Sequence, residues 1–376
     1  MSGGVASKSL PDLARVAGAF SLPGRFQGGQ PHGSGHINDT FLVAFDQPGQ
    51  PVRYVLQRIN EHVFRNVPAL MENVQRVTAH ASRRSAERGG ADTARRSLHL
   101  VPAPDGQVCH RDAAGGWWRC YQFIEGASSH DIIETPAQAR EAARAFGEFQ
   151  RLLSDLPGAR LHETIPNFHH TRQRFEALRR AIVADPRGRA AQVQEEIAFA
   201  HSREAMVDQL LALQERGDIP ERVTHNDTKL NNVMIDDVTG EGICVIDLDT
   251  VMPGLAPYDF GEMVRSATNA AAEDERDLTL VLARRPMFEA LVEGYLATAR
   301  AFLNEAEIGQ LAFAGRLMTY ENGIRFLTDF LQGDTYFKIA RPEHNLDRAR
   351  NQFALLRSLE TQQAEFEAVV RKYAGR

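Results

Sequence analysis

Three polar residues near the middle of the chain have types and spacing suited to phosphoryl transfer. Segment 223–232 reads VTHNDTKLNN and places Asp227 five residues before Asn232, and in segment 245–249 (VIDLD) Asp247 closes a short apolar run. Phosphoryl transfer requires little covalent help from a protein, but it requires an aligned hydroxyl group and neutralised phosphate charge. Asp227 is therefore predicted to accept the hydroxyl proton, and Asn232 and Asp247 are predicted to hold Mg²⁺.

The same residues have a plainer interpretation. His225 and Asp227 could form only a turn and a cap, because Asp and Asn favour such positions. An Asp at the end of the next strand and a Gly-rich turn upstream favour phosphoryl transfer. In that hypothesis His225 supports the loop. Lys229 is either a cation for the transferred phosphoryl group or a solvated loop residue.

The first 125 residues are predicted to form mainly β-structure with one helix. Turn residues and alternating polar and apolar side chains define the expected elements. These are strands at 24–32, 40–46, 51–59 and 98–101, a helix at about 68–88, and a hairpin with its turn at 112–116 and its return strand ending at Gly126.

Beyond Gly126 the pattern becomes helical, with one β island. The expected helices cover 136–153, 170–184, 189–215, 258–268, 286–302, 306–332 and 346–374, and the β island covers 222–247. This order predicts an α+β, bilobed chain with an N-lobe at 1–126 and a C-lobe at 127–376.

Composition excludes several classes of protein. The chain has 376 residues, 43% of them hydrophobic, and a formal net charge of −6. This balance indicates a globular protein and argues against a general nucleic-acid binder. No apolar run is long enough to span a membrane, and no signal peptide is recognisable. The three cysteines fit neither a disulfide scaffold nor a cysteine zinc site, and the cytoplasm is the expected compartment. A monomer or a homodimer is expected.

Six stretches carry a resemblance to a known family. They are GHINDTFLV (35–43), YVLQRIN (54–60), FIEG (123–126), HNDTKLNNVMID (225–236), IDLDTVMPGLAPYDFGEMVRSATNAAAEDE (246–275) and ENGIRFLTDFLQGDTYFK (321–338). They resemble the aminoglycoside phosphotransferase and choline kinase branch of the protein-kinase-like fold, most closely the N-acetylhexosamine 1-kinases. The resemblance implies that the chain binds ATP and Mg²⁺ and phosphorylates a small molecule.

The resemblance also implies where ATP binds in the N-terminal part. Turn residues Gly33, Ser34 and Gly35 would let backbone amides approach the phosphates, although a plain hairpin turn has the same composition. Asn38 and Thr40 are expected to reach the nucleotide, and Asp39 the acceptor. The hinge, through its backbone groups, would bind the adenine edge at Gln122, Phe123 and Ile124.

Arg58 is expected where the family carries a phosphate-binding lysine. A guanidinium can replace lysine there because its fork matches phosphate oxygens. Gln57 points to the other face of a regular strand, so a slip of one residue would exchange the two roles. Glu72 on the following helix is predicted to hold Arg58, or else to be a solvated helix residue.

The acceptor is expected to bind in the C-terminal part. Asp249, two residues after Asp247, is predicted to face the substrate or to support the metal ligand. Asp259 resembles the acid at a helix start that binds the catalytic loop. The resemblance places sugar contacts at Arg325 and Tyr336, which could otherwise be a surface ion-pair residue and a core aromatic.

The sequence thus predicts a MgATP-dependent kinase of a sugar hydroxyl, with the anomeric hydroxyl of N-acetylglucosamine or N-acetylgalactosamine as the best candidate. Choline, homoserine, hydroxylysine and aminoglycosides are rival acceptors. They are less favoured because cationic acceptors require acidic or aromatic walls. A catalytically inactive nucleotide-binding protein is a rival of another class. Such a protein has no chemical need for Asp227, Asn232 and Asp247 together.

Overall fold

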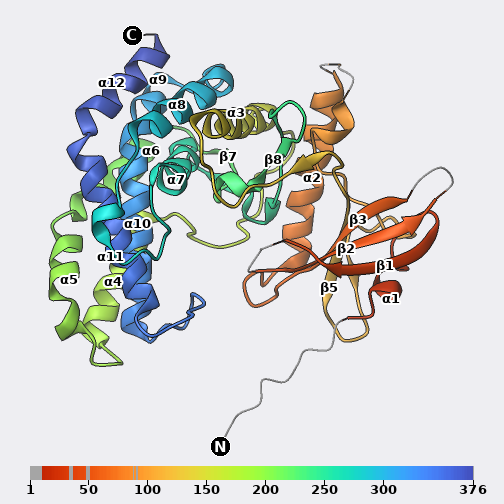
Figure 1. Cartoon of the computed structure of the whole chain (residues 1–376), viewed down its shortest axis with the longest axis horizontal. Coiled ribbons are helices and arrows are strands. Elements are labelled where there is room, and N and C mark those ends of the chain that lie inside the picture. Colours follow the sequence, from red (N-terminus) through yellow and green to blue (C-terminus); the bar gives the residue numbers. More distant parts are fainter. Residues whose placement is uncertain (1–10, 34–36, 48–50, 88, 90–91, 376) are drawn as a thin grey trace, which may run out of the picture.

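The computed structural model describes residues 11–33, 37–47, 51–87, 89 and 92–375. Figure 1 shows an antiparallel sheet at one end of the molecule and a large helical part at the other, with helix α2 standing between them. This arrangement confirms the predicted α+β fold with an antiparallel N-terminal sheet and a helical C-terminal part.

The N-terminal sheet contains five strands in the order β1-β2-β3-β5-β4, all antiparallel. The N-terminal elements are α1 (Leu13–Ala17), β1 (Arg25–Pro31), β2 (Asp39–Asp46), β3 (Val52–Arg58), α2 (Val67–Glu87), β4 (His110–Arg111) and β5 (Trp117–Gln122). Alternation in β2 buries Phe41, Val43 and Phe45 on one face, where they pack with α1. The opposite face is turned toward α2 and the helical part.

Helices dominate the rest of the chain. They are α3 (Pro136–Leu153), α4 (Thr171–Ala184), α5 (Gln194–His201), α6 (Gln209–Glu215), α7 (Ala256–Thr268), α8 (Arg285–Ala299), α9 (Glu305–Gly309), α10 (Leu311–Gln332), α11 (His344–Thr361) and α12 (Gln363–Ala374). Buried side chains of α2, α3, α7 and α8 belong to one hydrophobic core, so the helix of the N-terminal part shares its core with the C-terminal part. The two parts are therefore tightly joined.

Short strands carry the loops that form the candidate site. They are β6 (Ala127–Ser128), β7 (Arg222–Thr224), β8 (Val233–Asp236), β9 (Gly242–Val245) and β10 (Met252–Gly254). β8 and β9 form the predicted hairpin, and β6 pairs with β8. β7 pairs with β10, which brings the end of segment 222–224 beside the segment that follows Asp247.

Several predicted elements differ in the structure. Segment 98–101 forms only a bridge between Leu100 and Tyr121, because Pro102 follows it and cannot donate to a ladder. The helix predicted at 189–215 is divided into two helices and two 3₁₀ turns, and the one predicted at 346–374 is divided at Gln362. Helix α1 and strand β10 are too short for their patterns to indicate them.

Within the described ranges, no helix combines the length and the apolar character needed to cross a membrane.

Candidate active site

The loop after β7 is held by the first turn of α7. The backbone N–H of His225 donates to Asp259 Oδ2 at 2.8 Å, and that of Asn226 donates to Asp259 Oδ1 at 2.7 Å. Thr228 Oγ1 donates to the backbone oxygen of Asp259 at 2.5 Å. Asp259 is 1% exposed, and both of its carboxylate oxygens accept hydrogen bonds, from this loop and from Gln150. This is the contact expected for Asp259 from the family resemblance.

His225 supports the loop from the other side. Its Nε2 lies 2.9 Å from the backbone oxygen of Ile246, and its Nδ1 accepts the N–H of Asp227 at 3.3 Å. The ring must therefore donate at Nε2 and accept at Nδ1, which is a neutral tautomer. Phe146 and Phe149 of α3 pack edge-on against it. The ring thus joins the loop to the segment before Asp247.

Asp227 lies at the end of this supported loop with part of its side chain exposed. Asn226 before it is left-handed at φ 65°, a conformation that Asn tolerates better than most residues. Lys229 Nζ lies 3.4 Å from Asp227 Oδ1. Burial would raise the pKa of Asp227, but Lys229, together with further positive charge nearby that includes Arg265, outweighs this effect and holds the pKa below its ordinary value. Asp227 is therefore an ionised carboxylate, as a proton acceptor must be.

Asn232 and Asp247 lie near the same carboxylate. Asn232 Nδ2 donates to the backbone oxygen of Asp227 at 2.9 Å and lies 3.4 Å from Asp227 Oδ2, which turns Oδ1 of Asn232 outward as the atom for a cation. Asp247 is left-handed at φ 58°. Burial, with Asp249 and Asp227 nearby, raises the pKa of Asp247 to about 7. Such crowded carboxylates fit a divalent cation that would offset their repulsion.

The described residues contain no group of three or more His, Cys, Asp or Glu side chains that could hold a metal ion by themselves. Asn232 and Asp247 would supply two oxygen ligands. This number suits Mg²⁺ in kinases, because Mg²⁺ takes its remaining ligands from water and substrate phosphates.

Asp249 does not face a substrate, so of its two predicted roles only support of the metal ligand is left as a prediction. It is 2% exposed, and its two oxygens accept Asn38 Nδ2 at 2.6 Å and Nη1 of Arg119. Asn38 also accepts the N–H of Asn60 at 3.0 Å, so its amide is used inside the protein. Asp249 instead joins the sheet to the C-terminal part.

Arg58 is not brought to the site. It shares a face of β3 with Tyr54 and Leu56, which pack in the outer core of the sheet. Its guanidinium lies against Gly116 on that face. Glu72 does not contact it, because Glu72 accepts from His162 at 2.9 Å. The predicted ion pair between Arg58 and Glu72 is wrong.

The opposite face of β3 carries a connected polar row. Gln57 Nε2 donates to Thr40 Oγ1 at 3.1 Å, and Gln57 Oε1 accepts Nε of Arg119 at 2.9 Å. Arg119 then pairs with Asp249. Thr40 therefore lies on the same face of the sheet as Arg119, and its contact with the nucleotide stays a prediction. Asp39 lies opposite Arg58 in the register and is exposed, away from Asp227.

The turn and hinge residues are placed only in part. Gly33 is exposed with φ 78°, a conformation that favours glycine, and Ser34 and Gly35 lie outside the described residues. At the hinge, Gln122 N–H donates to His99 O at 2.9 Å, and Phe123 N–H donates to Arg53 O at 3.1 Å. Ile124 is buried. Binding of adenine at these three residues stays a prediction.

A charged network extends from Asp227 along α7 and α10. Lys229 interacts electrostatically with Glu262 and Glu273, and both carboxylates pair with Arg265, at 2.8 Å for Glu273. Asp227 raises the pKa of Lys229, and these two carboxylates add to this effect. Arg265, Glu262 and Glu273 are not among the site residues predicted from the sequence. The spacing of Glu262 and Arg265 on one helix turn was the available signal.

Arg325 lies next in this network. Glu262 Oε2 is 3.4 Å from Asn322 Nδ2, and Asn322 Oδ1 is 3.5 Å from Arg325 Nη1. The Arg325 guanidinium lies 5.5 Å from the ring centroids of both Phe168 and Phe337. It is thus held between two aromatic rings on the side of α10 that faces the network.

Tyr336 lies beside this pair of rings. Its ring is 4.7 Å from that of Phe337, and 62% of the residue is exposed, so it is not a core aromatic. Its backbone N–H donates to Asp329 Oδ1 at 2.8 Å, which fixes the turn after α10.

A second buried pair lies behind the catalytic loop. His169 Nδ1 is 2.9 Å from Glu321 Oε1, and His169 Nε2 is 2.8 Å from the backbone oxygen of Asn226. No sequence pattern indicates this pair, because its two residues are 152 positions apart. Only the fold brings them together.

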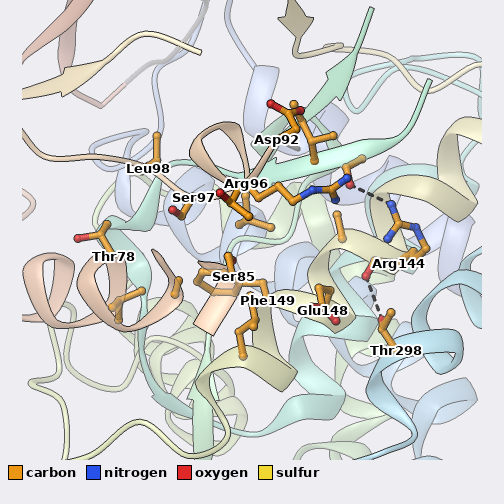
Figure 2. Close-up of a pocket in the computed structure, with 18 of the residues that line it drawn as sticks. Thr78, Ser85, Asp92, Arg96, Ser97, Leu98, Arg144, Glu148, Phe149 and Thr298 are labelled. Atoms are coloured by element: carbon orange, nitrogen blue, oxygen red, sulfur yellow. Dashed lines mark hydrogen bonds between the residues drawn. The ribbon is translucent and has the colours of Figure 1, made fainter. Parts of the chain in front are cut away.

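A cavity of about 640 Å³ lies between α2, α3 and β9. Figure 2 shows Thr78 and Ser85 of α2 and Arg144 and Phe149 of α3 among the residues that line it. None of the predicted site residues lines it. The cavity is therefore separate from the candidate site around Asp227.

The chain has the protein-kinase-like fold of a phosphotransferase. An antiparallel sheet is joined by a hinge to a helical part, and that part carries Asp227, Asn232 and Asp247 close together. The chain belongs to the Phosphotransferase enzyme family, whose model matches residues 28–305. This membership confirms the predicted class of small-molecule phosphotransferase that uses ATP and Mg²⁺.

Solved structures share the fold over nearly the whole chain. An aminoglycoside phosphotransferase from Alicyclobacillus acidocaldarius is 15% identical, with a TM-score of 0.59 and 99% of each chain covered. A spectinomycin phosphotransferase in complex with ADP and spectinomycin is 12% identical, with a TM-score of 0.55 over 93% of this chain and 97% of that one. A choline/ethanolamine kinase family protein from Mesorhizobium loti is 18% identical, with a TM-score of 0.51 over 95% of this chain and 98% of that one.

Proposed function

We propose that this phosphotransferase uses MgATP to phosphorylate a hydroxyl group of a neutral sugar. The best candidate is the anomeric hydroxyl of N-acetylglucosamine or N-acetylgalactosamine, which gives the sugar 1-phosphate. In this proposal the part of the chain up to Gly126 binds the nucleotide, and the helical remainder binds the acceptor.

The observation that carries the choice of acceptor is the position of Arg325 between two aromatic rings. One face of Phe168 and one face of Phe337 already lie under a guanidinium. A second cation there would be repelled. Guanidinium donors suit hydroxyl and amide oxygens of a sugar, and the exposed ring of Tyr336 suits its apolar face.

The charges around the base support the same choice. Glu262 and Glu273 pair with Arg265, and Glu321 pairs with His169. An aminoglycoside or choline site requires carboxylates free to meet a cation, whereas these carboxylates are already neutralised. A neutral acceptor is therefore favoured over the amine-bearing acceptors that the names of the similar structures indicate.

Asp227 would orient the acceptor hydroxyl and take its proton as the oxygen attacks the γ-phosphate. Asn232 and Asp247 would hold Mg²⁺, which, when bound, neutralises phosphate charge. An anomeric hydroxyl is more acidic than an ordinary alcohol. Asp227, whose pKa is held low, is therefore a sufficient base for this acceptor.

An ADP-release assay against a panel of acceptors tests this proposal. The panel contains N-acetylglucosamine, N-acetylgalactosamine, glucose, choline, homoserine, hydroxylysine and kanamycin, and phosphorus NMR identifies the product. Turnover of an N-acetylhexosamine to its 1-phosphate is expected. Turnover of an amine-bearing acceptor alone would contradict the sugar assignment and the role of Arg325.

A further inference from the structure

Arg119 on β5 is an arginine with no exposed surface and an unfilled donor. It is 0% exposed, its Nη1 pairs with Asp249, and its Nε donates to Gln57 at 2.9 Å. Its Nη2 has no hydrogen-bond partner within the described part of the chain, and the same is true of the buried hydroxyl of Tyr121, two residues further along β5. The guanidinium lies 5.3 Å from the Tyr121 ring.

Two unsatisfied groups side by side in a buried place require an explanation. Leaving one such group unpaired costs about 1–3 kcal/mol, and more when it is charged. Native proteins rarely tolerate this except where a ligand or water completes the bonds. The pair therefore indicates a place where a ligand with hydrogen-bond acceptors binds.

The position of the pair indicates which part of the ligand would lie there. Arg119 and Tyr121 share the sheet face of Gln57 and Thr40, and both interact electrostatically with Asp247, the predicted metal ligand. A ligand that reaches Nη2 from the metal site would need oxygens that accept a hydrogen bond from a guanidinium. The phosphates of the donor nucleotide have this chemistry.

We propose that Arg119 binds the donor phosphates through Nη2, in the role that the sequence analysis gave to Arg58. Asp249 and Gln57 position it, and the Tyr121 hydroxyl supplies a second donor. This inference rests on the phosphotransferase activity of the family and does not depend on the acceptor.

The residues that position the phosphate-binding arginine differ from those predicted from the sequence. Glu72 on α2 binds His162, and Asn73 beside it donates to the backbone oxygens of His162 at 2.8 Å and Val251 at 3.2 Å. Helix α2 is therefore tied to the C-terminal part and contributes no acid to Arg119. The segment that carries Asp247 positions the phosphate-binding cation directly, through Asp249.

Nucleotide binding measured without acceptor tests this inference. The Kd values of MgATP, MgADP and adenosine are measured by calorimetry for the wild type, Arg119→Gln, Arg119→Lys and the control Arg58→Gln. Arg119→Gln is expected to weaken MgADP and MgATP on the order of 10- to 100-fold, the loss of one or two charge-assisted hydrogen bonds, with adenosine unchanged. Arg58→Gln is expected to change none of the three.

Unchanged MgADP binding in Arg119→Gln would overturn the inference. Equal weakening of adenosine and MgADP would also overturn it, because it would show a role only in joining the two parts. Should Arg119→Gln fail to fold, Arg119→Lys decides between the same outcomes, since it keeps a charge but loses the guanidinium fork. Absence of turnover on every sugar would contradict the proposed acceptor and leave these binding results unaffected.

Discussion

The carboxylate of Asp259 accepts the backbone N–H of Asn226 at 2.7 Å, so a helix start holds the residue immediately before the predicted base Asp227. The bond acts on the backbone, and the position of Asp227 therefore depends on a residue that does not touch substrate. Displacement of a catalytic group by about 1 Å can reduce the rate of the catalysed reaction on the order of 100-fold.

Asp259→Ala is expected to lower both kcat and stability. The variant leaves two buried N–H groups unpaired, which should reduce the free energy of unfolding by roughly 2–5 kcal/mol and kcat by about tenfold or more. Steady-state ADP release and thermal unfolding measure the two effects.

Asp236→Ala is the matched control for Asp259→Ala. Asp236 is also buried and accepts two backbone N–H groups, of Val238 at 3.0 Å and Thr239 at 2.7 Å, but in the turn between β8 and β9. Asp236→Ala should lower the free energy of unfolding and leave kcat unchanged. Equal loss of kcat in both variants would show that Asp259 acts only through stability.

Arg325→Ala is expected to raise the KM of the sugar by about tenfold, because one or two hydrogen bonds from a charged group to the sugar are lost. The KM of ATP is expected to change less than about twofold. The matched control is Arg316→Ala on the same helix, because Arg316 is also half-buried and donates to Gln363 at 2.7 Å. Equal increases in both KM values for Arg325→Ala would mean that Arg325 is structural.

His169 gives the protein a pH-dependent stability. Burial lowers the pKa of His169, but Glu321 and the backbone oxygen of Asn226 together raise it by more, so the pKa of the folded state lies above the ordinary value of 6.5. Arg325 opposes this effect only in part. Since the folded-state pKa is raised, the stabilisation is fully present below pH 6.5 and is lost as the pH rises through that pKa.

Thermal unfolding between pH 5.5 and 9 measures this effect. The Tm of the wild type should fall with rising pH, and His169→Gln should be less stable at pH 6 and show a flatter profile. The control His62→Gln, at an exposed position, should follow the wild type. A profile for His169→Gln parallel to that of the wild type would contradict the linkage.

The features that depend on local spacing were the ones predicted most accurately from the sequence. Asp227 and Asn232 lie five residues apart on one loop, and the structure brings Asn232 Nδ2 to 3.4 Å from Asp227 Oδ2. Asp247 follows on the paired strand, so its approach to Asp227 also depends on a short hairpin. The order of strands and helices followed from periodicity, with errors at short elements and helix breaks.

Sequence could not predict which face of β3 meets the active site. Both faces of YVLQRI carry apolar residues, so alternation alone does not distinguish Arg58 from Gln57. Arg119 and Asp249 come from strands and turns 130 residues apart, and Glu72 and His162 from segments 90 residues apart. Such pairs depend on tertiary packing, which no local pattern reports.

The variant Asp227→Asn tests the proposed role of Asp227 as the base, since Asn keeps the shape of Asp and removes its capacity to take a proton. ADP release with MgATP and N-acetylglucosamine and MgADP binding by calorimetry are measured on the same preparation. For Asp227→Asn we expect kcat to fall by about 100-fold or more while the Kd of MgADP changes less than about threefold. A kcat within about tenfold of the wild type, with MgADP binding intact, would contradict Asp227 as the base.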